Sequence, residues 1–353
     1  MAVSIVVILV STLVFFRYIV GPNGKQILKI YCAASLLFPL GKIEEAYEML
    51  HPDTDVEIEG HGSIQVIRQV TELHQRADLL MVADYSLIPL MMYNSGNSNT
   101  STFADWYVRF ASNEIVLAYT DSSRRANDVN STNWFSILQE PNVVFGFPNP
   151  TIDALGYRAL MVIQLAEAYY GSNSIFHNLV TRNFDPPISS IPSDDNYTII
   201  VPEILQPKGH NIVLRASSIQ LVPLLESGSL DYCFLYTSNA KQYGLRYIEF
   251  PDEFNLGNPD FENLYEHIIV KFLHQRFATV ALDRKGETIY YGFTIPKNAV
   301  QPDLTEDLVK YLISDSGRDI FESAWQQILV PSYTDNEVAI PVGLRGLVIQ
   351  EPL

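Results

Sequence analysis

Leu28-Lys-Ile-Tyr-Cys-Ala-Ala-Ser35 is the stretch that decides the fold, because an apolar, strand-like run ends in one small polar residue before a helical pattern begins. The same order of strand, small polar residue and helix follows once more, with Ser63 after the second strand. Such an alternation predicts an open, largely parallel α/β sheet, which binds ligands beyond the carboxyl ends of its strands. The elements expected here are strand 28–33, helix 36–50, strand 54–59, helix 64–75 and strand 78–82.

A second alternation begins near residue 143 and predicts a second sheet. Residues 185–195 are rich in proline and are expected to form a loop, whereas 303–326 has the pattern of one long helix. The tail 345–353 is assigned to neither sheet. The elements expected in the second alternation are strand 143–147, helix 154–170, strand 211–216, helix 219–227, strand 231–236 and helix 238–243.

Four small polar residues stand where helices are expected to begin, namely Ser35, Ser63, Asp153 and Ser218. Ser and Asp at such positions are typical N-caps. The start of a helix offers unpaired N–H groups and about half a positive charge. Four starts that converge would supply about two positive charges, enough for a dianion without Lys or Arg. The plainer interpretation is that each residue only caps its own helix and that the four never meet.

The composition limits the size of the protein and the kind of partner it can have. With 353 residues and 47% hydrophobic content, the chain can form two domains with cores of their own. Its net charge of −17 argues against nucleic acid as a partner. Because the same charge repels an anion at long range, an anion site in this protein has to work through donors at short range.

The N-terminus carries an apolar run from Ala2 to Phe16, which Arg17 interrupts. The length of the run fits a signal-peptide core or a short membrane anchor, with a buried N-terminal helix as the alternative. We therefore expect residues 1–20 to be a signal peptide or an N-terminal membrane anchor. The rest of the chain is expected on the extracellular face of the cell membrane, in a periplasm-like space, either secreted or anchored.

The residue types that usually carry catalysis or bind metals form no consistent pattern. The sequence has no phosphate loop, no G-x-S-x-G elbow and no dinucleotide fingerprint. Cys32 and Cys233 have no zinc spacing and occupy core positions on separate strands, which disfavours a disulfide. His61 could activate Ser63 as in a hydrolase, but no acid that would orient the imidazole is evident. We therefore expect a binding protein with no cofactor and no enzymatic activity.

Several longer stretches resemble the archaeal-type molybdate/tungstate-binding proteins of ABC uptake transporters, and they follow in order from about residue 27 to about residue 330. The matching stretches are Ala77-Asp-Leu-Leu-Met-Val-Ala-Asp-Tyr-Ser-Leu-Ile-Pro89, 105–121, 131–134, Asn149-Pro150 with Gly156-Tyr-Arg158, 160–167, 226–232 and Tyr291-Gly-Phe-Thr-Ile-Pro-Lys-Asn298.

The resemblance implies a two-lobed, type II periplasmic-binding-protein-like fold, with two open mixed sheets joined by two crossover strands. By analogy, lobe 1 comprises residues 27–114 plus 290–353, and lobe 2 comprises 118–285. The lobes are expected to close on the ligand like a hinge. The implied partners are molybdate or tungstate and the permease subunits of an ABC transporter, and the implied state is a monomer.

The resemblance also assigns roles to individual residues. Ser35 and Ser63 match the two serines that donate hydrogen bonds to the oxyanion. Asp153 matches a carboxylate that binds the metal of molybdate or tungstate, and Tyr236 matches a tyrosine whose hydroxyl reaches the ligand. Arg158 follows Asp153 by five residues, so on a helix it is expected to point away from the site and to anchor the helix or pair with an acid.

One departure from the family pattern concerns the metal centre. In the family, two carboxylates complete six-fold coordination, but here Ser218 stands where the second, a Glu, is expected. The oxyanion is therefore expected to stay closer to tetrahedral, and a five-fold centre would result if Asp153 still coordinates. Because the family's second carboxylate is Ser218 here, another tetrahedral oxyanion, phosphate or sulfate, is the alternative ligand; hydrogen phosphate carries a proton that Asp153 could accept. An anchored sensor without transport is the alternative from another class.

Overall fold

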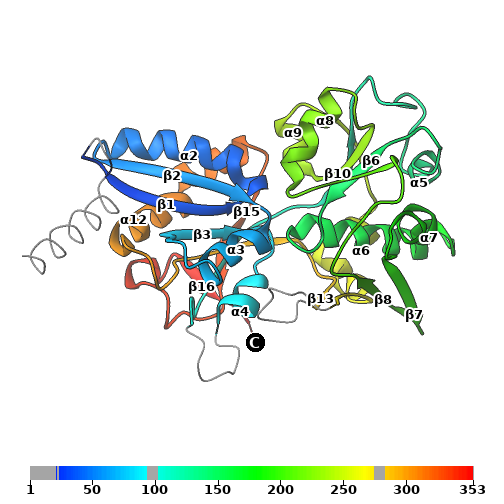
Figure 1. The fold of residues 1–353 in the computed structure, drawn as a ribbon. Helices are drawn as coiled ribbons and strands as arrows, with labels where there is room; N and C mark the ends of the chain where they lie inside the picture. Colours follow the sequence, from blue (N-terminus) through cyan, green and yellow to red (C-terminus); the bar gives the residue numbers. More distant parts are fainter. Residues whose placement is uncertain (1–20, 22–23, 94–101, 274–282, 353) are drawn as a thin grey trace, which may run out of the picture.

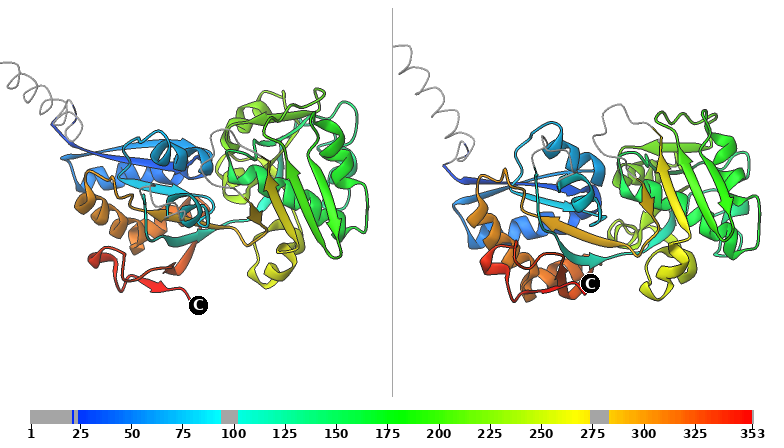
Figure 2. Two further views of the ribbon diagram at one scale, coloured as in Figure 1. Left: turned by 60° about the horizontal axis from the view of Figure 1, so that its bottom comes forward. Right: turned by 90° about the horizontal axis from the view of Figure 1, so that it is seen from below.

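The computed structural model describes residues 21, 24–93, 102–273 and 283–352, which form two bodies lying side by side (Figure 1). The N-terminal segment 1–20, predicted to be a signal peptide or anchor, lies outside the described residues. Among the helices of the described part, none is both long and apolar enough to cross a membrane. Both views in Figure 2 keep the two bodies side by side, with the C-terminus on the body that contains β1.

The first body is built on a seven-stranded mixed sheet in the order β16-β15-β4-β14-β3-β1-β2. β1 pairs in parallel with β2 and β3, as the first alternation predicted. The remaining pairs include antiparallel ones, so the sheet is less parallel than expected. Its strands are β1 (Gln26–Ala33), β2 (Thr54–His61), β3 (Leu79–Val82), β4 (Val108–Ser112), β14 (Tyr290–Thr294), β15 (Gln327–Thr334) and β16 (Val348–Gln350).

The helices of the first body include the predicted ones in order, but α4 was not expected and one long helix is divided. The pattern that predicted one helix over 303–326 forms two, because Ser314 has an extended backbone and its hydroxyl accepts a hydrogen bond from the N–H of Gly317 at 3.3 Å. The tail that was assigned to neither sheet contains β16 at the sheet edge. The helices are the 3₁₀ helix η1 (Ala34–Leu36), α2 (Leu37–Leu50), α3 (Ser63–Thr71), α4 (Leu87–Met92), α12 (Pro302–Ile313) and α13 (Asp315–Ser323), with the 3₁₀ turn η5 (Val342–Leu344).

The second body contains a five-stranded sheet in the order β11-β5-β10-β6-β9. Its central helix, α6 (Ala154–Tyr169), is apolar on nearly every face and is almost entirely buried, as expected of a helix packed on all sides. The strands are β5 (Ile115–Tyr119), β6 (Phe145–Pro148), β9 (Ile212–Arg215), β10 (Tyr232–Tyr236) and β11 (Arg246–Glu249). The shorter helices are α5 (Trp134–Ile137), α7 (Ile175–Leu179), α8 (Val222–Glu226), α9 (Thr237–Gln242), α10 (Asp252–Asn255) and α11 (Glu262–Tyr265), with 3₁₀ turns η2 (Thr181–Asn183), η3 (Ser218–Leu221) and η4 (Pro259–Phe261).

A four-stranded sheet in the order β13-β12-β8-β7 completes the second body, in addition to the two sheets that were expected. One of its strands lies in the segment 185–195, so the prediction of a loop there was wrong. Proline predicted a loop because it cannot donate a hydrogen bond to a neighbouring strand. This strand, however, lies at the edge of its sheet, where the missing N–H of proline can face away from the neighbouring strand. The strands are β7 (Ser189–Ser193), β8 (Asn196–Val201), β12 (Ile268–Phe272) and β13 (Arg284–Lys285).

The chain passes between the two bodies twice. It leaves the first body through Asn113 and Glu114, between β4 and β5, and returns through residues 286–289, between β13 and β14. The two connections lie against each other, since the N–H of Asn113 donates to the carbonyl oxygen of Ile289 at 3.3 Å. The result is an α/β architecture of two bodies joined by two connections, as the predicted fold class requires.

Candidate functional site

The structure brings the five predicted residues to the junction of the two bodies. Ser35 and Ser63 follow β1 and β2 of the first body, whereas Asp153 caps α6 and Ser218 and Tyr236 belong to η3 and β10 of the second. All five are buried, with exposed fractions of 6% or less.

Direct contacts join the two sets of residues across the junction. The side-chain amide of Asn239 donates to the carbonyl oxygen of Ser35 at 3.0 Å. In the opposite direction, the N–H of Gln65 in the first turn of α3 donates to the carbonyl oxygen of Ile152 at 3.2 Å. A Cβ on Gly62 would lie 2.3 Å from that same carbonyl oxygen, so only glycine allows the two backbones to approach this closely.

Of the four predicted N-caps, only Asp153 is one. Its backbone is extended and its carboxylate accepts a hydrogen bond from the N–H of Leu155 at 2.8 Å. Ser63 and Ser218 are instead the first residues of their helices, and Ser35 lies inside η1. The prediction was wrong for these three serines because each lies within its helix, one or two residues after the N-cap position, which Ala33, Gly62 and Ser217 occupy.

The hydroxyl of Ser35 accepts a hydrogen bond from the phenol of Tyr291, which itself accepts one from Asn113. The carboxamide oxygen of Asn113 accepts from the N–H of Glu114 at 3.1 Å, which identifies the other end of the carboxamide as the donor. That NH₂ group donates to the phenol oxygen of Tyr291 at 3.3 Å, and the phenol in turn donates to Ser35 Oγ at 3.2 Å. Ser35 Oγ is therefore an acceptor toward the protein.

Ser63 and Tyr236 have the same arrangement. The N–H of Ala83 donates to Ser63 Oγ at 3.0 Å, and the Nη1 of Arg158 donates to the phenol oxygen of Tyr236 at 3.0 Å. Neither a backbone N–H nor a guanidinium can accept a proton in a hydrogen bond. The direction of both bonds is thus set by the chemistry of the donor.

These three hydroxyls, of Ser35, Ser63 and Tyr236, keep their own protons unused within the described part of the chain. A hydroxyl has one proton to donate and two lone pairs that accept. A buried donor without a partner costs about 1–3 kcal/mol, so the arrangement favours an acceptor placed between the two bodies. An oxyanion, with several acceptor oxygens and a negative charge, matches this set of donors.

Asp153 and Ser218 lie next to each other: the carboxylate of Asp153 accepts a hydrogen bond from the N–H of Leu155 at 2.8 Å, and the backbone N–H of Ser218 is close enough to lower its pKa. Burial raises the pKa of Asp153 to about 7, although these two N–H groups and the charge of Arg158 act in the opposite direction.

Arg158 contacts the site, although its place in the sequence predicted that it would point away. It does anchor α6 and pair with an acid, as expected, since it donates to the carbonyl oxygen of Ala83 at 2.6 Å and lies 3.7 Å from a carboxylate oxygen of Asp84. It does not point away from the site, because the same guanidinium holds the Tyr236 hydroxyl. The side chain is long enough to extend back past one helical turn, which a helical-wheel argument ignores.

Asp84 is a functional candidate that the sequence analysis missed. Burial alone would raise its pKa, but the positive charges of Arg284 and Arg158 outweigh burial and hold the pKa at about 2. The signal was available in the stretch Ala77 to Pro89, where an aspartate follows directly on a buried apolar strand.

The hydrolase alternative gains no support from the geometry. His61 lies 2.9 Å from a carboxylate oxygen of Glu59, at the end of β2, and is about one-third exposed. In the described structure Ser63 has its hydrogen bond with Ala83 and none with an imidazole. Within the same residues, no group of His, Cys, Asp and Glu side chains is arranged to hold a metal ion, and Cys32 and Cys233 are both buried and free.

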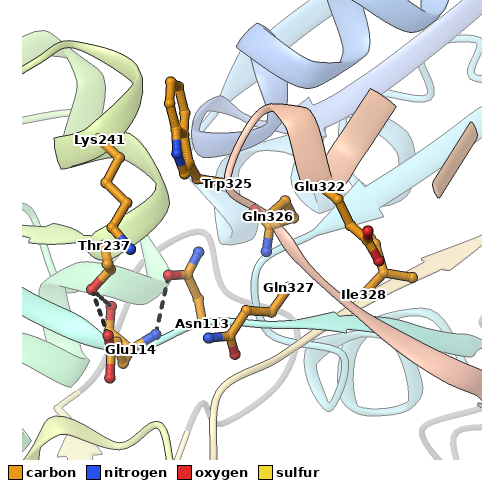
Figure 3. A pocket seen from close by; sticks show the side chains of 9 residues that line it. All are labelled: Asn113, Glu114, Thr237, Lys241, Glu322, Trp325, Gln326, Gln327 and Ile328. Atoms are coloured by element: carbon orange, nitrogen blue, oxygen red, sulfur yellow. Dashed lines mark hydrogen bonds between the residues drawn. The ribbon is translucent and has the colours of Figure 1, made fainter. Parts of the chain in front are cut away.

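A separate pocket of about 420 Å³ opens beside the first connection, between α9 and the turn from α13 to β15 (Figure 3). Glu114, Lys241 and Glu322 are the charged residues that line it, so its net charge is negative. The five predicted residues are not part of its lining. An anion is therefore better accommodated among the donors described above than in this pocket.

Comparison with known proteins assigns the chain to a family. The family described as bacterial extracellular solute-binding protein matches residues 28–324. An uncharacterized solute-binding protein of Methanococcus maripaludis is 37% identical over 92% of each chain. The molybdate/tungstate-binding protein WtpA of Pyrococcus abyssi is 34% identical over 91% of this chain and 89% of its own.

Two solved structures are similar in fold. The periplasmic molybdate-binding protein of Azotobacter vinelandii has a TM-score of 0.54 at 16% identity, covering 85% of this chain and 98% of its own. The sulfate-binding protein SubI of Mycobacterium tuberculosis has a TM-score of 0.54 at 10% identity, covering 86% and 88%. At these identities the two structures support the fold alone, whereas the sequence matches establish descent. The chain belongs to the bacterial extracellular solute-binding protein family and is a homologue of its molybdate/tungstate-binding members.

Proposed function

We propose that this solute-binding protein captures molybdate or tungstate between its two bodies outside the cell membrane and delivers it to an ABC importer. The observation that carries the proposal is the set of three buried hydroxyls, Ser35, Ser63 and Tyr236, each of which accepts from the protein and keeps its proton for a ligand. The name of the Pyrococcus abyssi relative supports the choice of anion. As a proposal, the two lobes comprise residues 27–114 plus 290–353 and residues 118–285.

Among tetrahedral oxyanions, the donor set favours one without protons of its own. Hydrogen phosphate has to donate its proton to an acceptor, and Asp153 is the one carboxylate among the five proposed residues. Its raised pKa makes Asp153 a poor acceptor below neutral pH and a good donor there. Molybdate and tungstate need only donors, so they suit the site over a wider range of pH. Phosphate or sulfate remains the competing ligand.

The first prediction concerns the two serines. Ser35→Ala and Ser63→Ala should each weaken tungstate binding by about 1–3 kcal/mol, because each removes one hydrogen bond to a charged group. Isothermal titration calorimetry measures the change. Ser332→Ala is the matched control, since Ser332 is equally buried in the first body but lies in β15, and it should bind as the wild type does. Unchanged affinity in both site variants would refute the assignment.

The second prediction concerns pH. Asp153, with a pKa near 7, donates to the anion when protonated and repels it when ionised. The dissociation constant of tungstate should therefore rise with pH above about 7, by at most roughly tenfold per pH unit for one proton. Asp153→Asn, which cannot ionise, should show a flat profile. A wild-type affinity that improves as the pH rises through 7 would mean that ionised Asp153 coordinates the metal or accepts a proton from the anion.

The third prediction concerns Ser218, which adjoins Asp153. X-ray absorption of bound tungstate should give a centre closer to tetrahedral than to octahedral, because a serine hydroxyl is a poor ligand for the metal. If the cleft is otherwise like that of the family, Ser218→Glu should raise tungstate affinity and the coordination number, because the two carboxylates would then ligate the metal instead of facing the anion as unpaired charges. Ser218→Gln, of similar size but without the charge, is the control. A six-coordinate spectrum with two protein oxygens in the wild type would contradict this alignment of Ser218, and loss of binding in Ser218→Glu would favour another anion.

A further inference from the structure

A buried cluster of charged side chains joins the two bodies beside the proposed anion site. Asp84 follows β3 of the first body, and Arg158 and Arg284 come from α6 and β13 of the second. Asp84 Oδ2 lies 3.3 Å from Arg284 Nη2 and 3.7 Å from Arg158 Nη2, and it also accepts a hydrogen bond from the phenol of Tyr157. In Figure 1, α6 runs from this junction into the second body.

The cluster can exist only when the two bodies are together. The side chains of Asp84, Arg158 and Arg284 are exposed by 1%, 2% and 7%, so all three charges have been removed from water. Removing a charge from water costs several kcal/mol, and the opposite charge offsets that cost only when the partners are in contact. Because Asp84 is on one body and both arginines are on the other, separation of the bodies breaks every one of these ion pairs.

Arg158 links this cluster to hydroxyls on both sides of the site. Its Nη1 donates to the phenol oxygen of Tyr236 on the second body and to the carbonyl oxygen of Ala83 on the first. The N–H of Ala83 is the group that donates to Ser63 Oγ. One guanidinium therefore contacts Tyr236 directly and holds the residue that orients Ser63.

We propose that Arg158 and Asp84 are positioning residues that hold Ser63 and Tyr236 in register around the bound anion and keep the two bodies closed. Asp84 holds Arg158 across the junction, and Arg158 fixes the lone pair of Tyr236 so that the phenol proton faces the ligand. The inference rests on the proposed function, since it assumes an anion among these hydroxyls. It predicts that loss of the cluster speeds release of the anion more than it slows capture.

The chain offers a matched control on the same strand. Asp78 immediately precedes β3 and Asp84 follows its end, and both are buried aspartates paired with arginine. The partners of Asp78 include Arg76 and the N–H of Lys29, all in the first body. Asp78→Asn therefore removes a comparable buried charge without touching the junction.

The experiment measures tungstate release by stopped flow and tungstate affinity by calorimetry in the full chain and its variants. Asp84→Asn and Arg158→Lys should each raise the dissociation rate about tenfold, within the range usual for coupled groups, with little change in the association rate. Small-angle scattering should show less compaction on adding tungstate than in the wild type. Asp78→Asn should keep the wild-type rate and compaction even if its melting temperature falls.

A positional role has a further signature. In a Tyr236→Phe background the phenol oxygen that Arg158 holds is gone, so Arg158→Lys should lose much of its effect on the dissociation rate. Folded Asp84→Asn and Arg158→Lys proteins with wild-type rates would overturn the inference, as would an equal loss in Asp78→Asn. If Asp84→Asn does not fold, Arg158→Lys carries the test. A wild-type protein that binds no tungstate would instead overturn the proposed function itself.

Discussion

A hydroxyl group has one proton to donate. At the junction of the two bodies, three hydroxyls each accept a hydrogen bond from a protein donor, and their own protons therefore cannot be donated to that same group. The N–H of Ala83, the phenol of Tyr291 and the guanidinium of Arg158 each donate to one of the hydroxyls of Ser63, Ser35 and Tyr236. The site is thus specified less by the hydroxyls themselves than by the donors behind them. The rest of the structure, from the parallel strands to the crossing connections, brings these donors into one place.

The strength of short-range donors explains how an acidic protein can bind an anion. The net charge of −17 is spread over the whole chain, and at physiological ionic strength charges farther away than about 8 Å are largely screened. A hydrogen bond to a charged group contributes about 1.5–3 kcal/mol, and several of them together exceed the residual repulsion. Arg158, which donates to Tyr236, shares the counter-ion Asp84 with Arg284, and Glu287 lies 3.3 Å from Arg284, so the positive charges beside the site have acidic partners. Hydrogen-bond direction, more than net charge, then decides which ligand is held.

The sequence predicted much of the fold and where several of the proposed site residues lie in it, for identifiable reasons. Buried strands that end in a small polar residue have a strong local pattern, which located Ser35 and Ser63 at the ends of β1 and β2. The N-cap assignment of these serines failed because the hydrogen bonds that they make are with residues distant in the sequence, Ala83 and Tyr291.

Edge strand β7 was missed because proline frequency is read locally, whereas the place of a strand in its sheet is a tertiary property. The link from Asp84 to Arg158 joins residues far apart in the chain, and no local pattern reports it.

The most direct test is a crystal structure of residues 21–353 with tungstate, located by the anomalous scattering of tungsten. We expect the anion within hydrogen-bonding distance of the hydroxyls of Ser35, Ser63 and Tyr236, beside Asp153, with the guanidinium of Arg158 still bonded to the phenol oxygen. Tungsten density in the pocket lined by Trp325 and Lys241, or an anion held directly by Arg158 with Tyr236 displaced, would contradict it.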